Sequence, residues 1–370
     1  MDFSLGEEQQ AVQDLARQLF TGSATTERVQ AVESTDDRID ADLWATLAET
    51  GLLGIALPAD LGGAGLGMTE LCVVLEEQGR QVAPVPVWSA VLAASAVAAH
   101  GSAGQRVAWV PGTADGSVRL TVALEEFGPG DPSSPTAAAN PDGGGWRVHG
   151  TKAAVPSLPG AQRVIVSAMT EAGPALFLVD PGAAGVVTER VETTSREICG
   201  HLVLDGASAE LLGKPGEGSV GWLVERAELA LAALQLGVAG GALRHAASYL
   251  SERAQFGRPL ATFQAVAHQL ADCYIDVEAM RVTLWQATLL VSNGEPSGTA
   301  VLVAKWWATD AGQRVVHRVQ HLHGGIGVDT DHPIHRYLLW GKQVAGTLGG
   351  SSSDLARMGA LFAAGAEISA

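Results

Sequence analysis

Residues 253–266 read RAQFGRPLATFQAV and separate two long stretches of apolar, helical periodicity. Gly257 and Pro259 disfavour helix, because glycine has too much conformational freedom and proline lacks an amide hydrogen. This break places Arg253 and Arg258 at a junction between helix and loop. The planar guanidinium group suits phosphate oxygens, which it often binds through two hydrogen bonds. The segment therefore predicts either a phosphate-binding junction or an ordinary interhelical turn with solvated arginines.

Helical periodicity dominates the sequence around this break. Apolar residues recur at spacings of three and four over residues 222–253, 263–291 and 299–321, followed by a short helix at 337–347 and a last one from Ser353. Helices this long and this apolar bury more than one face. The C-terminal part therefore predicts a helical bundle that also makes subunit contacts.

A glycine-rich turn follows the third of these helices. Residues 322–328 read LHGGIGV. Because the turn follows a helix and not a strand, it is not the fingerprint of a dinucleotide-binding fold. Its glycines predict either the close approach of a ligand to the backbone or a plain helix C-cap.

Imidazoles and carboxylates crowd the same region. They are His317, His321, His323, His332, His335, Asp329 and Asp331. The first two are four residues apart and share a helix face, so a metal site is one interpretation. No H-E-x-x-H pattern is present, and histidine is favourable near helix C-termini, so we expect no metal here.

Two helix starts carry further candidate chemistry. Residues 347–354 read TLGGSSSD, whose serines predict either an anion site at the N–H groups of the next helix or a plain N-cap. Glu228 lies near the predicted start of the long helix at Trp222. It is interpreted either as a favourable charge for the helix dipole or as a general base that faces a buried site.

The pattern changes toward the N-terminus. Short β-type runs alternate with clusters of Pro, Gly, Asp and Asn between residues 118 and 210, which predicts a small sandwich or barrel. Before residue 112 the helical period returns. We therefore predict an α+β fold with an N-terminal helical domain at 1–117, a middle β domain at 118–215 and a C-terminal helical bundle domain at 216–370.

The composition limits the class of protein. The chain has 370 residues and a formal net charge of −17 at pH 7. Nucleic acids and anionic membranes require a basic footprint, so we expect neither as a partner. Three cysteines far apart give no disulfide framework and no zinc spacing, and suit a reducing compartment. The polar start of the chain and the lack of a long uninterrupted apolar run complete the expectation of a cytoplasmic protein.

Together these motifs resemble the acyl-CoA dehydrogenase family over nearly the whole chain. The resemblance rests on residues 253–266, the His-Gly-Gly-Ile-Gly turn at 323–327, the Pro- and Gly-rich loop at 58–65, and the Gly-Thr-Lys sequence at 150–152. It implies a helical domain, a β domain and a four-helix bundle, with FAD as cofactor and electron-transfer flavoprotein as acceptor. The implied reaction oxidises an acyl-CoA to the 2,3-enoyl-CoA, with a base for the α-proton and the flavin for the β-hydride.

The resemblance also implies which residues bind the adenosine end of FAD across a subunit interface. On one side they are Arg253, Phe256 and Gln264. On the other side they are Gly324, Gly325 and Gly327. His321 is a further cofactor-binding candidate, at a position where the family often has glutamine. Two hydroxyl residues implied near the adenine are Ser351 and Ser353.

The sequence departs from the family pattern at the catalytic base. The position of the usual glutamate reads Gly349, and a glycine cannot remove a proton. A second known location for the base, near the start of the long helix, falls on Ala227. Glu228 is one residue away and so about 100° around the helix, which makes it the remaining candidate base in this chain.

A second departure concerns the flavin ring. The segment at the head of the middle domain reads Glu-Glu-Phe at 125–127, where the family has Thr-Glu-Pro. The ring-lining residues that follow Lys152 read Ala-Val-Pro at 154–156, where the family has aromatic and hydroxyl side chains. The ring-facing half of the implied flavin site is therefore altered, and the adenosine-facing half is retained.

These departures predict a partner subunit. The C-terminal stretch over 325–350 is most similar to subunits of actinobacterial heteromeric dehydrogenases that act on steroid side-chain CoA thioesters. The resemblance thus implies the base-deficient subunit of an α2β2 enzyme. Two alternatives stay open: a self-sufficient homotetramer that uses Glu228 as its base, and a non-catalytic protein that binds acyl-CoA or serves assembly.

Overall fold

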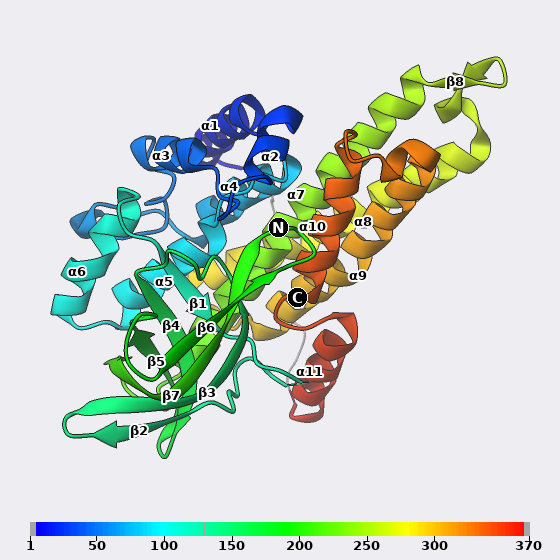
Figure 1. Ribbon diagram of the computed structural model, residues 1–370. Helices are drawn as coiled ribbons and strands as arrows, with labels where there is room; N and C mark the ends of the chain where they lie inside the picture. The colour runs from blue at the N-terminus through cyan, green and yellow to red at the C-terminus, as the bar shows by residue number, and fades with distance from the viewer. Residues whose placement is uncertain (1–4, 129, 366–370) are drawn as a thin grey trace. The chain divides into compact units, whose positions relative to one another are not determined.

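The computed structural model describes residues 5–128 and 130–365, which form two compact units (Figure 1). The helical unit contains residues 5–29, 72–83 and 229–365. The mixed unit contains the described residues of 30–71 and 84–228. This division follows spatial contacts and does not test the predicted domain boundaries near residues 117 and 215, which stay a prediction.

Short helices precede the sheet in the mixed unit. They are α3 (Ala41–Glu49), η1 (Ala59–Leu61), α5 (Val87–His100) and α6 (Ala103–Ala114), while α2 (Thr26–Val32) spans the division between the units. The α6 helix was not predicted from the sequence. It begins with a capping box, because Ser102 accepts a hydrogen bond from the Gln105 N–H and the Gln105 side chain accepts one from the Ser102 N–H. The S-x-x-Q pattern at 102–105 was the available signal.

Seven strands of the described residues form the sheet of the mixed unit, drawn in shades of green in Figure 1. They are β1 (Leu120–Ala123), β2 (Ala138–Asp142), β3 (Gly145–Val155), β4 (Arg163–Thr170), β5 (Gly173–Val179), β6 (Val186–Glu192) and β7 (Ile198–Leu212). The pairings β4–β2, β2–β3, β3–β7, β7–β5 and β5–β4 close a ring. Buried alternating side chains such as Val148, Val166, Phe177 and Leu202 fill its core. The prediction of a small β domain is confirmed.

One strand of this ring differs from its prediction. Residues 140–145 are one of the clusters of Asn, Pro, Asp and Gly that are typical of a loop, but 140–142 belong to β2 and pair with β3 around a two-residue turn. Gly143 and Gly144 both have positive φ, at 57° and 96°, as a tight hairpin turn requires. Pro141 is tolerated because β2 pairs only with β3 at that position, so no ladder hydrogen bond on the other side is lost.

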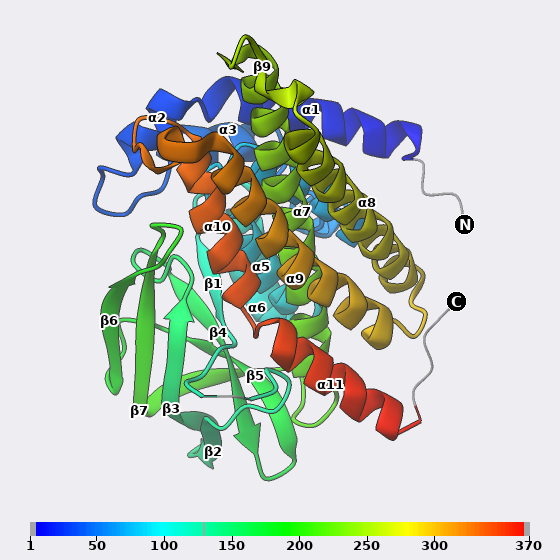
Figure 2. The same cartoon turned by 90° about the vertical axis from the view of Figure 1, so that its right-hand side faces the viewer.

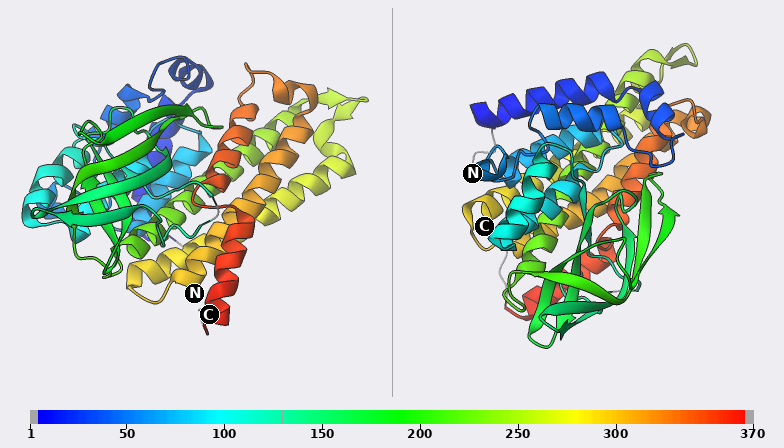
Figure 3. Two further views of the ribbon diagram at one scale, coloured as in Figure 1. Left: turned by 60° about the horizontal axis from the view of Figure 1, so that its bottom comes forward. Right: turned by 60° about the vertical axis from the view of Figure 1, so that its left-hand side comes forward.

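Long helices dominate the helical unit. They are α1 (Glu7–Ser23), the later part of α4 (Met68–Arg80), α7 (Ser219–Glu252) from residue 229 on, α8 (Gln264–Asn293), α9 (Gly298–His323), α10 (Ile334–Gly346) and α11 (Ser351–Ala363). Figure 2 shows α8, α9 and α10 side by side along the bundle. The left view in Figure 3 shows α11 as a separate helix beyond the end of α10. The predicted C-terminal helical bundle is confirmed, and each helix ends within a few residues of its predicted limit.

Glycines let α4 and α7 cross with their backbones in contact. A Cβ atom on Gly79 would lie 2.2 Å from the Leu234 carbonyl oxygen, and one on Gly237 would lie 2.0 Å from the Glu76 carbonyl oxygen. No side chain fits at either distance. The Ala- and Gly-rich composition of α7 thus sets how closely these two helices pack.

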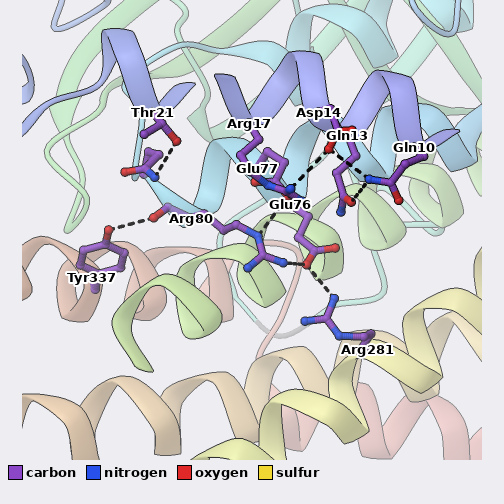
Figure 4. A network of polar contacts seen from close by, with 11 residues as sticks. Gln10, Gln13, Asp14, Arg17, Thr21, Glu76, Glu77, Arg80, Arg281 and Tyr337 are labelled. Atoms are coloured by element: carbon purple, nitrogen blue, oxygen red, sulfur yellow. Dashed lines mark hydrogen bonds and ion pairs between the residues drawn. The ribbon is translucent and has the colours of Figure 1, made fainter. Parts of the chain in front are cut away.

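Buried charges lie around this crossing (Figure 4). Glu76 and Glu77 have side chains only 1% and 2% exposed. Arg80 pairs with both carboxylates, Arg281 of α8 donates to Glu76 over 2.8 Å, and Arg17 of α1 reaches Glu77 over 3.3 Å. Carboxylates this deep require such partners, because a buried unpaired charge is strongly unfavourable.

One helix among the described residues is long and apolar enough to cross a membrane, namely α7. Of its most apolar window, 78% is buried inside the protein. That degree of burial is what a central helix of a protein core shows.

Candidate cofactor and catalytic site

The break at residues 253–266 is a projecting β-hairpin. Strands β8 (Ala254–Gln255) and β9 (Arg258–Pro259) pair antiparallel around Phe256 and Gly257, and η2 (Leu260–Thr262) leads on to α8. Both turn residues have positive φ, at 55° and 80°. Helix breaking was predicted correctly, but the hairpin was not, because its two-residue strands are too short to show a period of two.

The hairpin exposes the residues expected at the adenosine end of FAD. Phe256 is 89% exposed although positive φ is unfavourable for an aromatic residue. Arg253 and Gln264 are also exposed. The guanidinium of Arg258 lies 4.0 Å from the ring centre of Phe263, and this contact stiffens the base of the hairpin. An exposed phenylalanine in a strained turn indicates a surface that meets a ligand or another chain.

The glycine turn forms η3 (Gly324–Val328), directly after α9. Gly324 has φ 62° and ψ −140°, a conformation open essentially to glycine alone. Gly327 is buried, and a Cβ there would lie 2.9 Å from the Gln320 carbonyl oxygen. Gly325 and His321 are exposed, so the turn presents backbone to its surroundings. The C-cap interpretation therefore applies to Gly324, whereas Gly327 packs closely against the chain's own Gln320, and the approach of a ligand to this turn stays a prediction.

The last expected pair, Ser351 and Ser353, lies in the first turn of α11. Gly350 is the N-cap residue, and no side chain caps this helix. The prediction of a serine N-cap is therefore wrong, because α11 starts at Ser351 itself. Both serine side chains are half-buried.

These expected residues do not form one site within a single chain. Figures 1 and 2 show the hairpin and the start of α10 at one end of the bundle and α11 at the other. The helix α10 runs between these ends and has 13 residues. At a rise of about 1.5 Å per residue it separates them by roughly 20 Å. The hairpin and the glycine turn that precedes α10 lie toward one end of the bundle, and the first turn of α11 with Ser351 and Ser353 lies toward the other.

The position of the usual base has a distinctive geometry. Gly349 lies in the loop between α10 and α11 with φ 102°. Lys305 of α9, whose side chain is 1% exposed, donates from Nζ to the Gly349 carbonyl oxygen over 3.2 Å and to Thr309 Oγ1 over 3.1 Å. Asp354 is fully buried and lies 3.7 Å from the same Nζ. Neither residue was predicted from the sequence, although a lysine inside an apolar helix and an aspartate after three serines are visible signals.

Glu228 lies well inside α7, since this helix begins at Ser219 and not at Trp222 as predicted. The helix dipole acts mainly on the first turn, so it does not explain this carboxylate. Glu228 is 2% exposed. It is therefore a buried acid, as the base hypothesis requires, although burial is equally compatible with a structural role.

The segments expected to face the flavin ring lie together in the mixed unit. The Ala153 N–H donates to the Glu125 carbonyl oxygen over 2.9 Å, which joins residues 125–127 to the end of β3. Glu126 accepts hydrogen bonds from Lys152 over 2.5 Å and from the Thr136 and Ala137 N–H groups. Burial would raise the pKa of Glu126, but these donors outweigh it and lower the pKa to about 2. Glu126 is therefore already bound to the buried Lys152 and to neighbouring backbone groups.

The remaining groups of this surface suit a flavin ring poorly. Ala154 has φ 45° and donates its N–H to His201 Nδ1 over 3.1 Å, so this backbone donor is already used. Phe127 is 66% exposed and meets His201 edge to face at 4.9 Å. By contrast, the exposed arginine, glutamine and phenylalanine of the hairpin fit a phosphate and an adenine. The chain fits the adenosine end of FAD and not its ring.

The histidines predicted as a crowd separate into two groups. His317 and His321 are exposed on α9, whereas His323 and His335 are buried. His323 stacks on Tyr249 with ring centres 4.8 Å apart and lies 5.2 Å from the ring of His332. Over residues 5–128 and 130–365, no three His, Cys, Asp or Glu side chains are arranged to hold a metal ion.

Known proteins share the sequence pattern of most of this chain. Residues 6–117 match the acyl-CoA dehydrogenase N-terminal domain, and residues 220–358 match the acyl-CoA dehydrogenase C-terminal domain. Acyl-CoA dehydrogenase FadE27 of Mycobacterium tuberculosis is 40% identical over 370 residues, which cover 97% of this chain and 98% of that protein.

Two solved structures are similar over the whole chain. A variant of the Tcur3481–Tcur3483 steroid ACAD superposes with a TM-score of 0.95 at 60% identity, covering 98% of this chain and 99% of that one. The ChsE4–ChsE5 complex from Mycobacterium tuberculosis gives a TM-score of 0.93 at 39% identity, with 100% of both chains covered.

Proposed function

This chain belongs to the acyl-CoA dehydrogenase family, and we propose that it is the base-deficient subunit of a heteromeric enzyme of that family. The observation that carries the proposal is Gly349, which stands at the usual position of the catalytic glutamate and has a backbone conformation suited to glycine. A subunit without a carboxylate there needs a partner to remove the α-proton. The partner would be a second acyl-CoA dehydrogenase chain that retains the base.

The cofactor in this proposal is FAD, held partly by this chain. Arg253 would pair with the pyrophosphate, Gln264 would hydrogen-bond the adenosine end, and Phe256 would pack on it. When bound, the flavin accepts the hydride that leaves the acyl chain. This chain's contribution is to fix one end of the cofactor and so orient the other end toward the partner's substrate.

The substrate class in this proposal is a bulky acyl-CoA, such as a steroid side-chain thioester. The similar complexes named above support it, since both pair two differently named chains and one is called a steroid ACAD. Electron-transfer flavoprotein is the proposed acceptor and the cytoplasm the proposed location. Both follow from the family chemistry and from the acidic, cysteine-poor composition.

The test is flavin absorbance per protein chain, followed by anaerobic addition of acyl-CoAs that include a steroid side-chain thioester. We expect little flavin, or flavin that no thioester bleaches, when the chain is expressed alone. Co-expression with the base-containing chain should restore flavin that the thioester bleaches. A stoichiometric flavin that bleaches in the chain alone would contradict the proposal.

One alternative rests on the burial of Glu228. A homotetramer that uses this carboxylate as base predicts that Glu228→Gln lowers turnover by a factor of about 10²–10⁴. The proposed function predicts less than a twofold change in the complex. Glu225→Gln is the matched control, because that side chain is on the same helix and pairs with Arg226 instead. A chain that binds thioesters but gives no flavin reduction with any partner would favour a purely structural or binding role.

A further inference from the structure

The loop that carries Gly349 is strained on both sides of its turn. Leu348 is 2% exposed and has φ 57°, and Gly349 follows with φ 102°. Left-handed backbone at a buried leucine is unfavourable and persists only when the surroundings impose it. Something in the fold therefore holds this loop.

Two buried charged side chains, Lys305 of α9 and Asp354 of α11, lie beside this loop. Lys305 reaches from α9 and donates to the Gly349 carbonyl oxygen over 3.2 Å. It also donates to Thr309 Oγ1, which in turn donates to Asp354 Oδ2 over 3.3 Å. These side chains are almost fully buried, so the interactions are weakly screened. The carbonyl of Gly349 is thereby fixed against the first turn of α11.

The space beside Gly349 is filled in the direction that a side chain would take. A Cβ atom there would lie 3.2 Å from Ser353 Oγ, 3.3 Å from Ser353 Cβ and 3.6 Å from Asp354 Oδ1. That Oδ1 atom is buried and has no hydrogen-bond partner among the described residues. A side chain attached at Gly349 would thus press on Ser353 and lie against the buried carboxyl group of Asp354.

We propose that Lys305 and Asp354 are positioning residues that hold Gly349 in a glycine-only conformation, so that this loop cannot present a catalytic carboxylate. The inference rests on the proposed function and deepens it. The chain then lacks a base at this position because of the backbone conformation of the loop, and not only because Gly349 has no side chain. Gly349→Glu alone therefore does not turn this chain into a catalytic subunit.

The first experiment compares neighbouring glycines in the full chain. Gly349→Ala should lower the midpoint of thermal unfolding by a few degrees, because alanine is strained at φ 102°. Gly350→Ala is the matched control: its φ is −113°, and nothing lies within 4 Å of an added Cβ. Gly350→Ala should leave the midpoint unchanged. Equal midpoints for the two variants would overturn the proposal.

The second experiment asks whether Lys305 acts through Gly349. In a double-mutant cycle, the loss caused by Gly349→Ala should shrink in a Lys305→Met background, because the carbonyl is then free to turn. If Lys305 only supports the fold, the two losses add, and the positioning role is wrong. The cycle measures coupling, so the loss of stability that Lys305→Met causes by itself does not affect the conclusion.

The third experiment tests activity with Gly349→Glu in the complex and in the chain alone. The expected result is no added flavin that a thioester bleaches and a fall in midpoint at least as large as for Gly349→Ala. New bleaching by the isolated variant would overturn the inference. The proposed function fails on a different result, namely bleaching by the isolated wild-type chain, so the two failures are distinguishable.

Discussion

His323 shows at the scale of one residue how burial fixes a protonation state. Its Nδ1 lies 2.7 Å from the Val319 carbonyl oxygen and so carries the ring proton, while Nε2 is buried with no hydrogen-bond partner among the described residues. A second proton would have no acceptor. Burial lowers the pKa of His323; the bond to Val319 opposes this shift and His332 adds to it. The ring is therefore neutral around pH 7, packed flat on Tyr249.

The neutral ring predicts a pH dependence of stability. The groups that face this cluster are Arg244, His245 and Tyr249 of α7, Asp329 and His332 of the following loop, and His335 and Tyr337 of α10. The unfolded chain binds a proton near the ordinary histidine pKa of about 6.5. Because His323 resists that proton when folded, stability should be complete above that pH and fall as the pH drops below it.

A substitution checks the assignment to His323. His323→Phe keeps an aromatic ring on Tyr249 and removes the titration, so its unfolding midpoint should fall less between pH 7.5 and 5.5 than that of the wild type. His268→Gln is the control, because His268 is exposed on α8 and its removal should leave the slope unchanged. An unchanged slope in His323→Phe would refute the assignment.

At the scale of elements, the crossing of α4 and α7 depends on glycine. Gly237→Ala would place a Cβ 2.0 Å from the Glu76 carbonyl oxygen and 2.9 Å from the Arg80 nitrogen. Backbone atoms cannot move aside as a side chain can, so the two helices must separate. We expect a loss of about 1–3 kcal/mol or more in the free energy of unfolding, measured by urea titration.

The next glycine along the same helix is the control. At Gly240 the nearest atom to an added Cβ is Arg80 Nη1 at 3.7 Å, an ordinary contact. Gly240→Ala should be neutral or stabilise by up to about 1 kcal/mol, because alanine favours helix. If both variants lost a similar free energy of unfolding, Gly237 would not be needed for the close crossing of α4 and α7.

The buried charges join three elements, α1, α4 and α8. Glu76→Gln leaves Arg80 and Arg281 facing each other without the carboxylate, so we expect a loss of about 3–5 kcal/mol in urea titration. Asp14→Asn is the control from the same network, because Asp14 is 61% exposed and pairs with a half-exposed Arg17. That change should cost less than about 1 kcal/mol. If both variants lost a comparable free energy of unfolding, burial would not determine how much these ion pairs contribute to stability.

At the scale of the whole molecule, the features expected to bind FAD lie at opposite ends of the bundle. Under the proposed function a single chain thus supplies only part of the FAD site, and a second chain supplies the rest. Arg253→Ala should weaken flavin retention of the complex without changing the unfolding midpoint of the chain, since Arg253 is exposed. Flavin retained after gel filtration measures this effect. Arg147→Ala, at a half-exposed arginine paired with Asp142 in the mixed unit, should retain flavin fully.

The sequence by itself determined the α+β class, the long helices, the small β domain and the family. These features follow from local periodicity, from turn residues and from motifs whose members are close in the chain. The hairpin at 254–259 and the strand β2 were not predicted, because their signals are short or contain proline. The residues named for FAD were read from motif resemblance, and their roles stay predictions.

Only the tertiary structure decided what surrounds those residues. The sequence shows a glycine at position 349, but not that its φ is 102° or that Lys305 and Asp354 hold it. Nor does it show that His323 stacks on Tyr249, or that Gly237 rests against the backbone of Glu76. Such contacts join residues far apart in the chain. Helix packing sets their distances, and no local pattern of residue types encodes them.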